Sequence, residues 1–148
     1  MRDERLFEPE FVSGLFEEMA ATYGVTNYVS SFGFCQRWRK RCVELADIKP
    51  GMTVSDLMTG MGECWQFIDR RLSGEGRLVA LDFCPEMCRR AEQRRAGVPD
   101  LPVDVLEEDF LENSIPSESA DCVVSAFGIK TFSTDQKVVA AAHIHRIL

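Results

Sequence analysis

Two glycines and an acid occur at spacings that suit recognition of a nucleotide-like ligand. Residues 54–65 predict a short apolar strand, a turn at Gly60 and Gly62, and the start of a helix. Glycine permits a sharp turn and a close approach to a ligand, and the amino end of a helix offers N–H groups that favour a carboxylate or a phosphate. Asp82 ends the next expected strand, where an acid is placed to accept hydrogen bonds from ribose hydroxyls.

Two kinds of cofactor fit such a turn. A dinucleotide-binding loop of the form G-x-G-x-x-G requires a third glycine at position 65, where Trp65 stands and would block close packing of the helix on the strand. S-adenosylmethionine carries an adenosine but no pyrophosphate. Asp56, just before the glycines, is placed to pair with its ammonium group while backbone N–H groups bind its carboxylate. The loop alone is also compatible with an ordinary corner whose acids are solvated.

The predicted elements explain how these residues come together. Apolar segments at residues 54–57, 77–82, 103–106 and 120–127 predict strands, and helical patterns lie between them. Strands that alternate with helices predict an α/β fold, a Rossmann-like doubly wound parallel sheet with at least four strands.

The carboxyl ends of these strands carry most of the candidate chemistry. They present the glycine loop, Asp56, Asp82, Asp109 and the segment 125–130. In a doubly wound sheet the ligand lies past these ends, so three acids and the glycine loop converge on one edge. Scattered surface acids are the alternative interpretation.

A helical segment precedes the sheet. Residues 9–23 have one apolar stripe, residues 25–33 form a connection that could close over a site, and residues 34–47 predict a second helix. The second helix is expected to pack through Cys35, Trp38, Cys42 and Leu45. Its basic residues Arg37, Arg39, Lys40 and Arg41 are expected to be solvated. We divide the chain into an N-terminal helical cap at 1–48 and a cofactor-binding domain at 49–148.

Composition narrows the function classes. A net charge of −7 argues against a nucleic-acid backbone as the main partner. No apolar run approaches the roughly 18 residues that a membrane span needs. Six cysteines on mostly apolar positions indicate reduced packing thiols and a cytoplasmic protein. Cys84 and Cys88 lack a second Cys or His pair, so no metal site is expected. His143 and His145 are expected to be surface or packing residues.

The last residues predict an incomplete sheet. The chain stops at Leu148 on a helix, which leaves the fourth strand as an uncovered edge. We therefore expect a fragment, a natural truncation, or a chain whose sheet edge is covered by a second copy or a partner chain.

The order of motifs resembles the class I S-adenosylmethionine-dependent methyltransferases, and within them the ubiquinone/menaquinone biosynthesis C-methyltransferase branch. The resemblance covers nearly the whole chain. It rests on Phe16–Asn27, Ser31–Arg39, the cofactor loop Ser55–Gly62, Ala80–Met87, Asp121–Lys130 and the final His143–Leu148.

The resemblance implies a role for each candidate site residue. Asp56, Gly60 and Gly62 would hold the methionine end of the cofactor, and Asp82 would bind the ribose. Met87, Asp109 and Phe110 would lie against the adenine, and Phe83 is a further residue expected to bind the cofactor. Tyr23 would help to close the site, and residues 125–127, beginning with Ser125, would form its floor.

One departure concerns the acceptor. The quinone branch usually has Arg-Asn where Lys130 and Thr131 stand, and a lysine supplies charge without a bidentate fork. We expect methyl transfer to a small or lipid-like aromatic acceptor of the quinol type, with positioning as a major source of rate and with no catalytic base named. A catalytically silent cofactor-binding or partner-binding module is the alternative, and a nicotinamide-dependent dehydrogenase is a weaker one.

Overall fold

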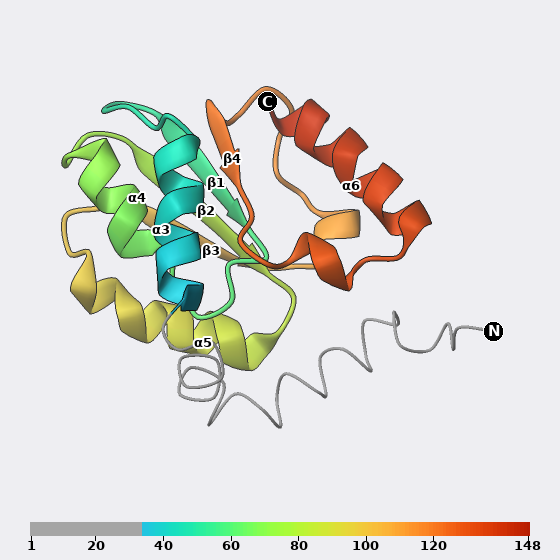
Figure 1. The fold of residues 1–148 in the computed structure, drawn as a ribbon, viewed down its shortest axis with the longest axis horizontal. Coiled ribbons are helices and arrows are strands. Elements are labelled where there is room, and N and C mark those ends of the chain that lie inside the picture. Colours follow the sequence, from blue (N-terminus) through green and yellow to red (C-terminus); the bar gives the residue numbers. More distant parts are fainter. Residues whose placement is uncertain (1–33) are drawn as a thin grey trace.

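The computed structural model describes residues 34–148, and its strands and helices alternate along the chain (Figure 1). The strands are β1 (Thr53–Leu57), β2 (Arg77–Asp82), β3 (Val103–Glu107) and β4 (Cys122–Val124). The α-helices are α3 (Phe34–Leu45), α4 (Trp65–Leu72), α5 (Pro85–Arg94) and α6 (Thr134–Ile147). Short 3-10 helices are η2 (Arg95–Gly97), η3 (Phe110–Glu112) and η4 (Ile129–Thr131).

The four strands form one parallel sheet in the order β3-β2-β1-β4. The chain starts in the middle, moves to one side through β2 and β3, and then crosses to β4. This reversal confirms the predicted doubly wound topology, and it places the switch point between β1 and β4. Within the described residues β4 is an edge strand. What covers that edge stays a prediction.

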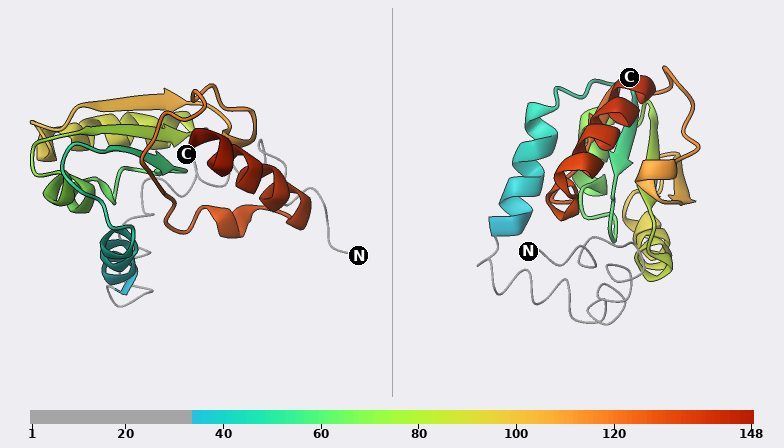
Figure 2. Two further views of the ribbon diagram at one scale, coloured as in Figure 1. Left: turned by 90° about the horizontal axis from the view of Figure 1, so that it is seen from above. Right: turned by 90° about the vertical axis from the view of Figure 1, so that its right-hand side faces the viewer.

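Side chains on the two faces of the sheet enter two different cores. On one face Val54, Leu78 and Val124 pack with α3, α4 and α5. On the other face Leu57 and Leu81 pack with η3 and α6. Successive strand residues point to opposite faces, which is why apolar runs along these strands serve both cores. α4 and α6 lie at opposite ends of the long axis of the molecule (Figures 1 and 2).

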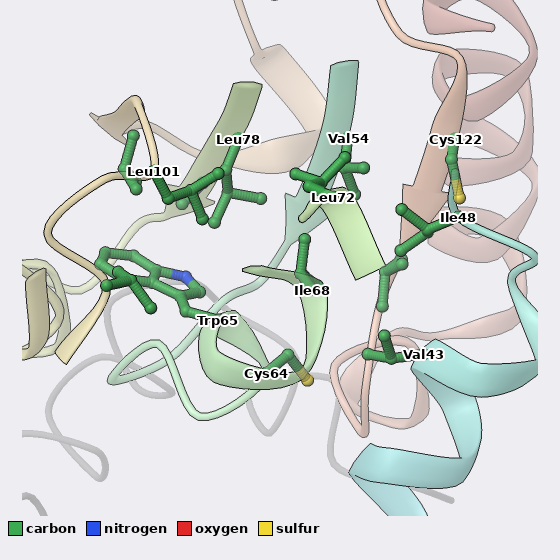
Figure 3. Close-up of a cluster of buried hydrophobic side chains, with 14 of the residues drawn as sticks. Val43, Ile48, Val54, Cys64, Trp65, Ile68, Leu72, Leu78, Leu101 and Cys122 are labelled. Carbon is green, nitrogen blue, oxygen red and sulfur yellow. The ribbon is translucent and has the colours of Figure 1, made fainter. Parts of the chain in front are cut away.

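Trp65 is the largest fully buried side chain of the described residues. It lies at the first position of α4, in the core cluster that also contains Ile68 and Leu101 (Figure 3). A Cβ on Gly62 would lie 2.8 Å from Cδ2 and Cε2 of Trp65, so the glycine makes room for the indole. The indole therefore packs against the loop in the space that the missing Cβ of Gly62 leaves open.

Two details of the predicted elements are wrong. The fourth strand has only three residues, Cys122–Val124, instead of spanning 120–127, and the left-handed φ of 73° at Phe127 is incompatible with an extended strand that reaches this residue. α3 packs against the core through Cys42 as predicted, but not through Trp38 and Leu45, which are 57% and 67% exposed. It packs through Val43 and Arg39 instead, since Arg39 finds a buried acidic partner on the glycine loop.

Val43 and Ile48 lie in the same core cluster as the sheet. The division of the chain at residue 48 stays a prediction. Among residues 34–148, no helix has the length and apolar character needed to cross a membrane.

Candidate cofactor-binding site

A cavity of about 120 Å³ opens past the carboxyl ends of the strands, at the edge where the sequence predicts a ligand. The loops after all four strands contribute to its walls. Most of the predicted cofactor-binding residues line it: Asp56, Gly60, Asp82, Phe83, Met87, Asp109 and Phe110. The structure therefore brings together residues that lie up to 54 positions apart in the sequence (56 to 110).

Among the described residues, two of the predicted site residues, Gly62 and Ser125, do not line the cavity. Tyr23 lies outside the described residues. Gly62 lies against the indole of Trp65 rather than at the cavity wall. Ser125 does not line the cavity, whereas the next two residues, Ala126 and Phe127, do. The buried Oγ of Ser125 has no hydrogen-bond partner among the described residues.

The turn after β1 does not offer its N–H groups to a ligand as predicted. Gly60 donates its N–H to Asp82 Oδ2 at 2.8 Å, and Met61 donates to Glu63 Oε2 at 3.0 Å. The N–H of Gly62 donates to the carbonyl of Thr59 at 3.1 Å. The expectation of free N–H groups is therefore wrong for these three residues, because buried backbone donors are almost always paired.

Asp56 is the most deeply buried acid of the site, at 1% exposure. Its Oδ2 accepts a hydrogen bond of 2.6 Å from the hydroxyl of Thr59. The Oγ1 of Thr59 in turn accepts a hydrogen bond of 2.9 Å from the indole Nε1 of Trp65. Burial, together with the charges of Glu63 and Asp82, raises the pKa of Asp56 to about 7. Thr59 thus links the predicted ammonium-binding acid to the buried indole, a role that only the folded geometry shows.

Asp82 joins two loops at the end of β2. Besides the N–H of Gly60, its carboxylate accepts the N–H of Cys84 at 3.0 Å. Burial raises the pKa of Asp82, and these backbone hydrogen bonds oppose that rise. The acid is 6% exposed but lines the cavity, so it can accept hydrogen bonds from a ligand while it holds the loop.

Stability is expected to depend on pH through Asp56. A carboxyl group whose pKa is about 7 when folded and near 4 when unfolded keeps its proton longer in the folded chain. Its stabilising effect is therefore complete below about pH 4. The free energy of unfolding then falls by up to about 1.4 kcal/mol per pH unit as the pH rises towards 7.

The matched comparison is the variant Asp56→Asn, which is neutral at every pH. Urea unfolding of both proteins at about pH 5 and about pH 8 should show Asp56→Asn gaining on the wild type at the higher pH. A stability difference that does not change with pH would contradict the raised pKa of Asp56.

Arg39 and Glu63 form a buried ion pair that the sequence pattern did not reveal. Nη2 of Arg39 donates to Oε1 of Glu63 at 3.0 Å, and both side chains are less than a tenth exposed. The guanidinium carbon of Arg39 and the ammonium of Lys130 each lie 5.4 Å from the ring centroid of Phe127. A basic residue inside a helix of basic residues carries no signal that marks it as buried, because its partner lies 24 positions away.

The adenine side of the predicted site is apolar. Met87 is buried, and Phe110 stacks on Phe132 with 6.3 Å between ring centroids. Asp109 accepts the N–H of Leu111 at 2.8 Å and thereby caps η3. Among residues 34–148 there is no group of three or more His, Cys, Asp or Glu side chains that could hold a metal ion.

Comparison with known proteins gives the family. The model of the ubiE/COQ5 methyltransferase family matches residues 3–148. The chain belongs to the ubiE/COQ5 methyltransferase family.

Two curated relatives show how the chain aligns within this family. It is 36% identical over 134 residues to a demethylmenaquinone methyltransferase of Thermus thermophilus, and the match covers 90% of this chain and 59% of that protein. It is 29% identical over 140 residues to a ubiquinone/menaquinone biosynthesis C-methyltransferase of Hydrogenovibrio crunogenus, covering 93% of this chain and 54% of that protein. The chain thus spans between half and three-fifths of the length of these relatives.

Solved structures support the fold. A SAM-dependent methyltransferase of Aquifex aeolicus superposes with a TM-score of 0.65 at 22% identity, covering 74% of this chain and 57% of that chain. A TehB-like SAM-dependent methyltransferase of Corynebacterium glutamicum gives a TM-score of 0.57 at 20% identity, covering 81% and 67%. Both confirm the Rossmann-like architecture of this family member.

Proposed function

We propose that this chain binds S-adenosylmethionine and takes part in methyl transfer to an aromatic acceptor of the quinol type. The observation that carries the proposal is the chemistry of one cavity wall in a member of this family. Buried Asp56 and Asp82 line the cavity together with the apolar residues Met87 and Phe110. This donor set suits a ligand that is cationic at one end and carries an apolar base at the other.

The residues present fit the parts of this cofactor. Asp82 would accept hydrogen bonds from the ribose hydroxyls, and Asp56 would pair with the ammonium group. The adenine would be surrounded by four residues that line the same cavity as Asp82: Phe83, Met87, Asp109 and Phe110. When bound, the cofactor supplies an electrophilic methyl group on a sulfonium.

The chain's own contribution to the reaction is positioning and the exclusion of water. The acceptor must approach the methyl group in line, and holding the two reactants in this geometry supplies much of the rate. Phe127, Lys130 and Thr131 also line the cavity and would contact the acceptor. An electron-rich aromatic ring needs no dedicated base to attack a sulfonium methyl group, and the ring proton is lost to solvent afterwards.

A nicotinamide dinucleotide suits this cavity less well. Four acids line it, Asp56, Glu63, Asp82 and Asp109, and they would repel a pyrophosphate. The N–H groups of Gly60 and Met61, which such a pyrophosphate would need, are already donated to carboxylates. The catalytically silent module is not favoured, because the family and the curated relatives are named as methyltransferases.

Calorimetric titration tests the cofactor. The 148-residue chain is titrated with S-adenosylhomocysteine and, separately, with NAD. We expect saturable one-to-one binding of S-adenosylhomocysteine and none of NAD. A folded chain that binds neither would contradict the proposal.

Transfer of a labelled methyl group to a short-chain demethylmenaquinol then separates an enzyme from a silent module. Labelled product would support the quinol-type acceptor. Binding of the cofactor without transfer to this or other reduced quinones would favour the silent module.

A further inference from the structure

The cavity is rich in carboxylates, and this raises a question about the cofactor's own carboxylate. Asp56, Glu63, Asp82 and Asp109 line it. Their charges suit the sulfonium and the ammonium of S-adenosylmethionine, but they oppose a further anion. A ligand carboxylate can enter such a cavity only against a cation or a set of strong donors.

The backbone of the glycine loop is a poor source of those donors. The N–H of Gly60 is donated to Asp82, that of Met61 to Glu63, and that of Gly62 to the carbonyl of Thr59. A ligand carboxylate that took the first two would leave the carboxylates of Asp82 and Glu63 without these donors in a buried place. An unsatisfied buried charged group costs more than the new hydrogen bond would return.

Arg39 supplies what the loop does not. Of the described residues, two basic ones line the cavity: Arg39, which is buried at 8% exposure, and Lys130, which is exposed. The guanidinium has five N–H donors in a planar fork that matches a carboxylate. Within residues 34–148, the guanidinium donates a hydrogen bond from Nη2 to Glu63 Oε1.

Glu63 holds the guanidinium in place at the loop. Its Oε1 accepts from Arg39, and its Oε2 accepts the N–H of Met61 at 3.0 Å. The same Oε2 lies 3.1 Å from the position that a Cβ on Gly60 would take, so the carboxylate lies directly over the turn. Glu63 therefore fixes Arg39 next to the residues predicted to hold the methionine end of the cofactor.

We propose that Arg39 binds the α-carboxylate of the cofactor's methionine moiety, with Glu63 as its positioning residue. The assignment rests on the proposed function, and it names the group that binds one end of the cofactor. It gives helix α3, outside the sheet, a direct part in the site. Fork-to-carboxylate pairing is charge-assisted and specific in direction, so it would also orient the methionine chain.

The test compares two ligands that differ in the carboxylate alone. S-adenosylhomocysteine and its decarboxylated analogue are titrated by calorimetry into the wild type and into Arg39→Gln. We expect Arg39→Gln to weaken S-adenosylhomocysteine binding by roughly tenfold to 150-fold, the range for a lost hydrogen bond to a charged group. The affinity for the decarboxylated analogue should change by less than about threefold.

Three further variants control for charge and for folding. Arg41→Gln removes an exposed arginine from the same helix and should leave both affinities unchanged. Arg39→Gln combined with Glu63→Gln removes the unpaired buried carboxylate that the single variant leaves, and it should show the same ligand-specific loss. Arg39→Lys keeps the charge without the fork and should retain part of the affinity for S-adenosylhomocysteine.

Equal losses for the two ligands in Arg39→Gln and in the double variant Arg39→Gln with Glu63→Gln would overturn the assignment, since Arg39 would then act only through the loop. That result would leave the proposed function standing. A folded wild-type chain that binds neither ligand would overturn the proposed function and this assignment together.

Discussion

Replacing Trp65 with alanine is expected to lower the free energy of unfolding by about 3–5 kcal/mol. The indole is fully buried in the core cluster between α4 and the sheet, and it packs on the space that Gly62 leaves open. Its loss would leave a cavity and would remove the hydrogen bond to Thr59 Oγ1. Urea unfolding followed by circular dichroism measures the change.

Trp38→Ala is the matched control, because Trp38 is 57% exposed. It contacts Phe34 and Phe127 through tilted ring pairs, so its removal should cost less than about 1.5 kcal/mol. Trp65→Phe, which keeps most of the apolar volume but not the indole N–H, should fall between the two. Equal unfolding midpoints for Trp65→Ala and Trp38→Ala would show that the buried indole is not central to the core.

Replacing Asp82 with alanine is expected to weaken binding of S-adenosylhomocysteine by about 3 kcal/mol, a loss of roughly a hundredfold. Two effects add. The ribose would lose a charged acceptor, and the N–H groups of Gly60 and Cys84 would lose the carboxylate that holds them. Calorimetric titration of the variant measures the loss directly.

Asp104→Ala provides the control for this variant. Asp104 is an acid on the neighbouring strand β3, its side chain is about half exposed, and it is paired with Arg77 away from the cavity. Its removal should leave the affinity unchanged. Asp82→Asn keeps one acceptor oxygen and should lose less than Asp82→Ala. An unchanged affinity in Asp82→Ala would remove the ribose assignment while leaving the fold and the family as they are.

The parallel sheet and the edge that carries the site could be predicted from local patterns. Parallel strands that are joined by right-handed helical crossovers place their carboxyl ends along one edge of the sheet. Because Asp56, Asp82 and Asp109 each follow or end a predicted strand, their convergence required no knowledge of side-chain contacts. The cavity at this edge is lined by these three residues.

The packing of α3 could not be predicted in full from local sequence patterns. Apolar spacing pointed to Cys35, Trp38, Cys42 and Leu45 as its buried face. Cys42 does pack against the core, but Trp38 and Leu45 are exposed, and the helix turns Arg39 and Val43 inward. A charged residue is buried when a partner of opposite charge is available, and Glu63 lies far along the chain. Periodicity counts residue types within a helix, so it cannot detect such a partner.

The sequence by itself therefore determined the class of fold, the order of motifs and the acids of the candidate site, because these depend on periodicity and on short spacings. Only the tertiary structure decided how hydrogen bonds are shared within the site. It showed that Asp82 and Glu63 accept the N–H groups of the glycine loop, and that Arg39 is held beside that loop. These pairings join residues from different elements, and each donor can be assigned only when all of its possible acceptors are in place.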